Sequence, residues 1–175
     1  MARRIENLSD RVPRLKEMAT RNYPVVKSNY LIQKTRYDLN LSEQKLILHL
    51  IQMIEPKDDD FKTYPFSIKD YCKVCEIDYK NGKNYMNIRS TLKTLSDKSF
   101  WIEQEDGTEL LMRWIDKVRI DRRKGVIDIR LDKDLKPYLL QLKQFFTKYN
   151  YLYVMTMRSQ YSIRLYEILK SYENV

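Results

Sequence analysis

The chain has 175 residues and a mass of 21.4 kDa, a size that suits one domain or two small ones. Hydrophobic residues make up 43% of it, enough for a real core, while three glycines and five prolines exclude collagen-like and low-complexity classes. Lys and Arg outnumber Asp and Glu by 33 to 24, and the resulting charge of +9 indicates a polyanionic partner, nucleic acid or an anionic membrane.

The membrane alternative has little support in the sequence. The longest strongly apolar stretch, Leu46–Ile54, contains His49 and Gln52 and is too short to cross a bilayer. The first ten residues are basic but lack the apolar centre of a secretory signal. With two cysteines and no signal, the sequence indicates a reducing compartment, and we expect a cytoplasmic protein.

Positive charge is concentrated in two segments. Residues 1–37 carry nine Lys/Arg against three Asp/Glu, and residues 113–133 carry eight against four. In residues 1–24 apolar side chains recur at helical spacing but Pro13 interrupts them, which predicts a basic, partly helical arm ahead of one domain over residues 25–175. Such clustering is typical of a phosphate-binding surface, although charge also serves solubility alone.

The domain is predicted to begin with a strand and a helix. Val25–Gln33 mixes β-branched and aromatic residues and fits a strand. Ser42 then caps a helix that runs to about Glu55, with an apolar face for the core, and Pro56 ends it.

Two more helices are predicted to follow an acidic loop. Ser67 begins the second, and Asp70 completes a Ser-x-x-Asp capping signature. Asn81 and Gly82 then form a strong break, after which a third helix runs over about 83–98.

The third helix has a polar side that suits a DNA groove. Its other side carries apolar residues at helical spacing, and no acidic residue lies between Lys83 and Leu95, where phosphate would repel a carboxylate. We predict that four residues face DNA and that two flank them toward phosphates: Lys83, Asn87, Ser90 and Thr94, then Arg89 and Lys93. The alternative is an ordinary solvated face, because every amphipathic helix has one.

A β-meander is predicted next. Ser99–Gln104 fits a strand, Asp106-Gly107 a hairpin turn, and residues 109–121 one long alternating strand that joins Val126–Leu131 through a basic tip. Arg119 lies out of phase with the apolar residues, and the tip is Arg122, Arg123, Lys124 and Gly125. Adjacent cations repel one another without a counter-charge, which favours a phosphate clamp over a merely solvated turn.

Helical patterns return at the C-terminal end. Asp134–Lys143 fits a helix with Pro137 in its first turn, and Phe145–Met157 is ambiguous between strand and helix. Ser159–Tyr172 is predicted as a final helix with one apolar face, made of Tyr161, Leu165, Ile168 and Tyr172. Three helices followed by a basic hairpin is the order of a winged helix, so we predict an α+β winged-helix fold with additional C-terminal helices.

No catalytic or metal-binding set can be assembled from the sequence. Cys72 and Cys75 form a Cys-x-x-Cys pair, but His49 is the only further soft ligand for zinc, so core packing is the favoured interpretation. A tyrosine nickase needs a metal held by several histidines, which a single histidine cannot supply. We therefore expect no enzyme activity, no metal and no cofactor.

Several segments, in order, resemble the N-terminal winged-helix module of the iteron-binding plasmid replication initiators. They cover roughly residues 25–172, and the most specific is Ser-x-Tyr-Ser-Ile-Arg-Leu-Tyr-Glu-Ile-Leu at 159–169. The others are Asn-x-Leu-Ile at 29–32, Leu-Ser-Glu-Gln-Lys-Leu at 41–46, Gly-x-Ile at 125–127, Pro-Tyr-Leu at 137–139 and Phe-Thr-x-Tyr at 146–149.

This resemblance implies a protein that binds direct repeats in duplex DNA at a plasmid origin as a monomer and represses its own gene as a dimer. The family usually carries a second winged helix, for which this sequence shows no pattern. Relatives dimerise through the N-terminal module, and residues 110–120 offer an apolar strand edge for such pairing.

We therefore expect a DNA-binding and dimerisation module, with a homodimer and host replication proteins as further partners. Two alternatives stay open: a protein-interaction module whose charge serves solubility, and a winged-helix transcription regulator without a role in replication.

Overall fold

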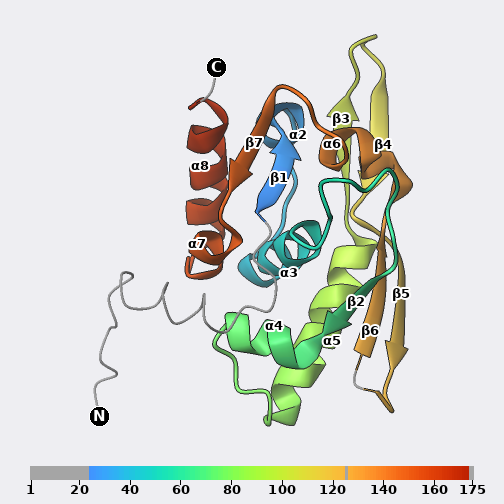
Figure 1. Cartoon of the computed structure of the whole chain (residues 1–175), viewed down its shortest axis with the longest axis vertical. Helices are drawn as coiled ribbons and strands as arrows, with labels where there is room; N and C mark the ends of the chain where they lie inside the picture. Colours follow the sequence, from blue (N-terminus) through green and yellow to red (C-terminus); the bar gives the residue numbers. More distant parts are fainter. Residues whose placement is uncertain (1–23, 125, 174–175) are drawn as a thin grey trace.

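The computed structural model describes residues 24–124 and 126–173 (Figure 1). Helices combine with three small antiparallel sheets, so the predicted α+β class is confirmed. The predicted N-terminal arm, except for Pro24, and Gly125 of the predicted hairpin tip lie outside the described residues.

The first strand is shorter than predicted. β1 (Val25–Ser28) ends where α2 (Asn29–Lys34) begins, so the predicted strand over residues 25–33 is wrong beyond Ser28. The Ser28 hydroxyl accepts a hydrogen bond from the Leu31 amide at 3.1 Å, which caps the short helix and turns the chain.

Helix α3 (Leu41–Ile51) begins and ends earlier than predicted. Its cap is Asn40 rather than Ser42: the Asn40 side chain accepts from the Glu43 amide at 3.0 Å, and the Glu43 carboxylate accepts from the Asn40 amide at 2.9 Å. This reciprocal capping box outcompetes a serine two residues further on. The helix ends at Ile51, four residues before the predicted end.

The next two helices agree closely with their prediction. Ser67 caps α4 (Ile68–Val74) by accepting from the Asp70 amide at 3.2 Å, and α5 spans Gly82–Asp97. The strand β2 (Tyr64–Ser67) before them has only four residues and contains a proline, so its sequence gave no signal.

The long strand predicted over residues 109–121 is wrong. It is two strands, β4 (Glu109–Arg113) and β5 (Ile115–Asp121), which break at the fully buried Trp114. β4 pairs with β3 (Ser99–Glu103), whereas β5 joins a three-stranded sheet of order β2-β6-β5. Trp114 and Ile115 are both buried, and two consecutive inward residues cannot belong to one regular strand.

The hairpin that follows confirms the predicted wing. β6 (Val126–Leu131) pairs with both β5 and β2, and its apolar residues at 127, 129 and 131 face the core. Figure 1 shows the β5–β6 hairpin projecting beside α5.

The C-terminal third is more broken than predicted. The helix expected over residues 134–143 is a 3-10 turn, η1 (Lys133–Leu135), and a short α6 (Lys136–Leu139), because the chain leaves the helix at Leu140 and Gln141 takes a positive φ of 50°. The ambiguous segment contains both elements: β7 (Phe146–Tyr149), which pairs with β1, and α7 (Tyr151–Met155). The final helix, α8 (Gln160–Ser171), matches its prediction and is capped by Ser159.

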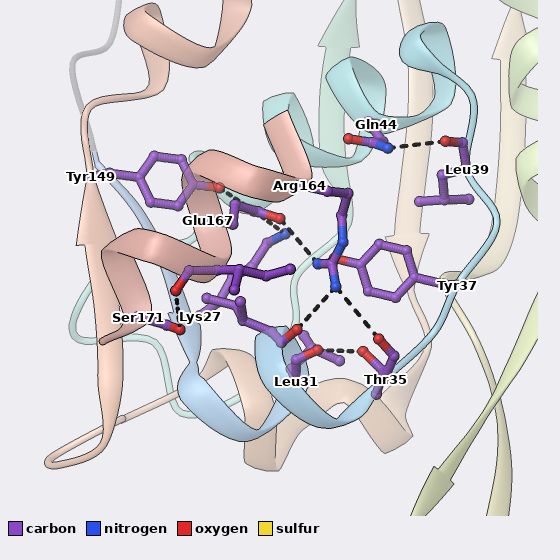
Figure 2. Close-up of polar contacts among 12 residues, drawn as sticks. Lys27, Leu31, Thr35, Tyr37, Leu39, Gln44, Tyr149, Arg164, Glu167 and Ser171 are labelled. Carbon is purple, nitrogen blue, oxygen red and sulfur yellow. Dashed lines mark hydrogen bonds and ion pairs between the residues drawn. The ribbon is translucent and has the colours of Figure 1, made fainter. Parts of the chain in front are cut away.

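Helix α8 packs against the domain through polar side chains (Figure 2). Lys27 of β1 and Glu167 of α8 form an ion pair at 2.6 Å in which both side chains are at most 2% exposed. Tyr149 of β7 donates to Glu167 at 2.5 Å, and Arg164 donates to the Tyr37 hydroxyl at 2.6 Å and to the Ile32 carbonyl at 2.9 Å. These contacts join strand, helix and loop segments far apart in the sequence.

Candidate nucleic-acid interface

Helix α5 is held in place by its buried apolar face and by contacts at its C-terminal end. Ile88, Leu92 and Leu95 are buried in the core, which fixes the rotation of the helix. At its C-terminal end Lys98 forms an ion pair with Glu43 of α3 at 2.7 Å and donates to the Asp38 carbonyl at 2.7 Å. Burial alone would raise the pKa of Glu43, but hydrogen bonds from Lys98 and Asn40 outweigh it and lower that pKa.

The outward side of α5 carries the residues predicted from the sequence. All six are exposed: Lys83, Asn87, Arg89, Ser90, Lys93 and Thr94. Within this set Lys93 pairs with Asp97 at 2.6 Å, and the Thr94 hydroxyl donates to the Thr91 carbonyl at 3.1 Å. The predicted exposure of this face is therefore confirmed, and contact with DNA stays a prediction.

The wing tip turns its cations outward. The Asp121 carboxylate accepts from the amides of Arg123 and Lys124 at 2.9 and 3.1 Å, which shapes the turn from inside. Arg122, Arg123 and Lys124 are all exposed. Since the turn is stabilised through backbone amides, the three cationic side chains are not used to build it.

A groove of about 380 Å³ lies between α5 and the wing and brings part of the predicted set together. Arg89 of α5 and Arg122 of the wing tip both line it. The other lining residues are Asp121 and the apolar or aromatic Ile68, Tyr79, Tyr85, Met86 and Ile120. The groove therefore combines an apolar floor with guanidinium groups from both of its walls.

Met86 is the residue of this face that the sequence did not reveal. It is 54% exposed and lies one helical turn from Lys83, Ser90 and Arg89, in the middle of the polar side of α5. Tyr79, 49% exposed, lies in the same groove from the loop before the helix. A single methionine among polar residues gives no periodic signal, so the place of Met86 in the groove is seen only in the structure.

Arg119 is not brought together with the others. Ile120 lines the groove beside α5, whereas Arg119 lines a separate hollow with Thr63 and Asp128, because neighbouring residues of a strand point to opposite faces. In the hairpin register Arg119 lies opposite Asp128, which partly balances its charge. The structure thus divides the predicted site into the α5–tip face and an Arg119 face.

The residues considered for metal binding or catalysis lie in or against the core. Cys72 is 1% exposed and Cys75 packs beside it, so core packing of the pair is confirmed; burial raises the pKa of Cys75 to about 11. His49 lies among Phe66, Tyr71 and Tyr151, with its Nδ1 2.5 Å from the Tyr151 hydroxyl. Within residues 24–124 and 126–173, no three His, Cys, Asp or Glu residues gather in a metal-binding arrangement, and no helix is long and apolar enough to cross a membrane.

Comparison with known proteins assigns this arrangement to a family. Residues 24–170 match the family described as Initiator Replication protein, WH1. The chain belongs to this family. A replication initiation protein of Escherichia coli is 28% identical over 141 residues, which is 77% of this chain and 43% of that protein, so the chain spans less than half the length of this relative.

A solved structure shares the fold. The Pi initiator protein, crystallised in complex with iteron DNA, superimposes with a TM-score of 0.69 over 90% of this chain and 67% of that one, at 15% sequence identity. The winged-helix fold predicted from the order of the elements is therefore confirmed, and so is the resemblance on residues 25–172.

Proposed function

We propose that this chain is the DNA-binding module of a plasmid replication initiator that recognises repeated duplex sites, iterons, at an origin. One observation carries the proposal: α5 and the β5–β6 tip converge on a single face that is polar, cationic and, along α5 from Lys83 to Leu95, free of carboxylates. The Pi initiator of the same fold binds iteron DNA, which supports the assignment. We propose a non-enzymatic, cytoplasmic protein.

The geometry suggests a division of tasks across this face. A helix fits the major groove of duplex DNA, where Asn87 and Ser90 can hydrogen-bond to base edges and Met86 can contact a thymine methyl group. The tip cations Arg122, Arg123 and Lys124 then reach phosphates beside that groove. Phosphate contacts fix the position of the helix, and base contacts supply sequence preference.

The test is binding to sequences recovered by selection from a random duplex library. Replacing Arg122, Arg123 and Lys124 by alanine should weaken binding to the selected repeat by about tenfold or more at physiological salt. The matched control replaces three exposed lysines on other faces, Lys34, Lys143 and Lys148, and removes the same charge. If both triple variants weaken binding equally, net charge alone accounts for the effect and the wing tip has no special role. If the selection recovers no preferred sequence, the proposal is overturned.

We further infer a homodimer, with repression of its own gene by the dimer and with host replication proteins as partners at the origin. The strand edge expected over residues 110–120 is divided between β4 and β5; on β4, Leu111 is exposed and is the cross-strand partner of the exposed Trp101 of β3. Analytical ultracentrifugation of the chain tests the dimer itself.

A further inference from the structure

A second pocket, of about 380 Å³, shares helix α4 with the groove beside the wing. Ile68 of α4 lines that groove, whereas Asp70 and Val74 of the same helix line the second pocket. The rest of its wall comes from the C-terminal end of α3, the loop up to residue 63, strand β2 and Tyr151 of α7. This pocket is therefore separate from the α5–tip face.

The wall of this pocket is acidic, although the chain as a whole carries a charge of +9. Three carboxylates line it, those of Glu55, Asp58 and Asp70, against the single ammonium of Lys62. We call it the acidic pocket. Its net negative charge repels phosphate, so it suits neither DNA nor a nucleotide, and it favours a cation instead.

Two of the three carboxylates are available to a ligand. Asp58 builds the loop itself, because its carboxylate accepts from the Glu55 amide at 2.9 Å and also pairs with Lys62. Glu55 and Asp70 have only loose partners: Lys57 lies 3.6 Å from the first and Lys73 lies 4.0 Å from the second. Both of these lysines are largely exposed, so they hold the carboxylates weakly.

Two buried polar groups of the same wall lack a partner. Gln52 is 4% exposed, and within residues 24–124 and 126–173 no group donates a hydrogen bond to its Oε1. Tyr64 is 3% exposed, and among the same residues its hydroxyl proton has no acceptor. Buried polar atoms are nearly always paired, so an unpaired amide oxygen in the wall of a pocket indicates a bound group that donates to it.

We propose that the acidic pocket binds a guanidinium group, which donates to Gln52 Oε1 and to the carboxylates of Glu55 and Asp70. A guanidinium carries five N–H donors in one plane, so a single group can serve an amide oxygen and two carboxylates at once. Met53 and Val74 supply an apolar wall for the methylene stem that such a group carries.

A metal ion fits the acidic pocket less well than an organic cation. No three His, Cys, Asp or Glu side chains in the described part of the chain converge as metal ligands would. The guanidinium can belong to a free compound or to an arginine side chain of a partner protein. The chemistry of recognition is the same for both, and the experiment below separates them.

The first experiment is an NMR titration of the isotope-labelled whole chain with ethylguanidinium chloride at constant ionic strength. The side-chain amide of Gln52 and the backbone amide of Asp70 should shift and saturate, with a dissociation constant on the order of a few millimolar. Sodium phosphate should not shift them. Shifts that stay linear up to about 50 mM ethylguanidinium would show that the pocket holds water only, and they would overturn the proposal.

Two variants place the guanidinium in the pocket. Gln52→Leu should weaken binding about tenfold or more without lowering the melting temperature, because it removes the unpaired buried oxygen and keeps the size of the side chain. Asp70→Asn, at a half-exposed position, should weaken binding about three- to tenfold. The matched control, Asp59→Asn, is exposed and lies outside the pocket wall, so it should change binding less than about twofold.

Either pocket variant binding as tightly as the wild-type chain overturns the proposal, and so does an equal loss in the Asp59→Asn control. Acetyl-Gly-Arg-Gly amide and free arginine then separate the two sources. Binding of the peptide as tightly as ethylguanidinium assigns the pocket to a partner's arginine side chain, and binding of free arginine alone assigns it to a small solute. Duplex affinity of Gln52→Leu should stay within about twofold of wild type, so this proposal and the proposed function fail separately.

Discussion

Helices α5 and α8 are both amphipathic, but they differ in what they bury. α5 buries Ile88, Leu92 and Leu95 and exposes cations and small polar groups, whereas α8 buries Glu167 and Ser171 beside Ile163 and exposes tyrosines and leucines. Lys27, which is buried in β1, forms an ion pair with Glu167 and so favours this face of α8. Amphipathic periodicity therefore shows that a helix has two faces, and the buried charges around it decide which face packs inward.

The largest effect is expected from breaking the buried ion pair. Lys27→Met should lower the free energy of unfolding by about 3 kcal/mol, because the buried Glu167 carboxylate loses its nearest cation and keeps only Arg164, 3.3 Å away, and the Tyr149 hydroxyl. Chemical denaturation measures this loss. The double variant with Glu167→Met should recover most of it, since two apolar groups replace the two charges.

A matched pair on α5 makes the contrast quantitative. Lys93 and Asp97 lie at the same 2.6 Å as Lys27 and Glu167, but their side chains are 75 and 61% exposed. Lys93→Met should change the unfolding free energy by less than about 0.5 kcal/mol. Similar losses for Lys27→Met and Lys93→Met would show that burial does not distinguish the two helices.

The pH dependence of stability separates α8 from its neighbour α3. Burial lowers the pKa of His49 on α3 from 6.5 to about 4, so the unfolded chain binds more protons and stability falls as the pH drops from about 6.5 to 4, by about 3 kcal/mol. On α8, burial alone would raise the pKa of Glu167, but Lys27, Tyr149 and Arg164 hold it below its usual 4.5. The contribution of ionised Glu167 to stability is therefore lost only at a lower pH than its usual pKa of 4.5.

Denaturation curves between pH 4 and 7 measure the histidine effect directly. The His49→Gln variant should lose the part of the pH slope between 6.5 and 4, while Tyr149→Phe should keep it, because Tyr149 bonds to Glu167 rather than to His49. Identical slopes for wild type and His49→Gln would contradict a buried neutral histidine.

A smaller effect on duplex binding is expected from the apolar centre of the α5 face. Met86→Ala should weaken binding to the selected repeat about three- to fivefold, and replacing thymine by uracil in that repeat should give a similar loss. If Met86 contacts a thymine methyl group, the two changes are not additive. Met86→Ala without any effect would remove this contact from the interface.

The sequence predicts α5 and the wing well because their local signals agree with their surroundings. Ser67, Asn81 and Asp121 each cap or turn the chain within two or three residues, and periodicity alone identifies the inner face of α5. The single strand predicted over residues 109–121 is wrong because Trp114 continues the alternation of residues 110 and 112, and the change of pairing partner depends on tertiary packing.

Other features had no local signal at all. The Lys27–Glu167 pair joins residues 140 positions apart, and a lysine in a strand reads as an exposed residue until its partner is known. For the same reason the outward stripe of α8 and the place of Met86 in the groove became visible only from the coordinates. The sequence located the cationic side chains, and the fold shows which of them share a face.

The salt dependence of duplex affinity tests the proposed interface most directly. Because each phosphate contact releases a counterion, the logarithm of the binding constant should fall steeply and linearly with the logarithm of the salt concentration. Replacing Arg122, Arg123 and Lys124 by alanine should reduce that slope by about two to three, whereas the Lys34, Lys143 and Lys148 triple variant should leave it within about one of wild type. Equal slopes for the wild-type chain and the wing-tip variant would contradict the claim that the wing tip contacts phosphates.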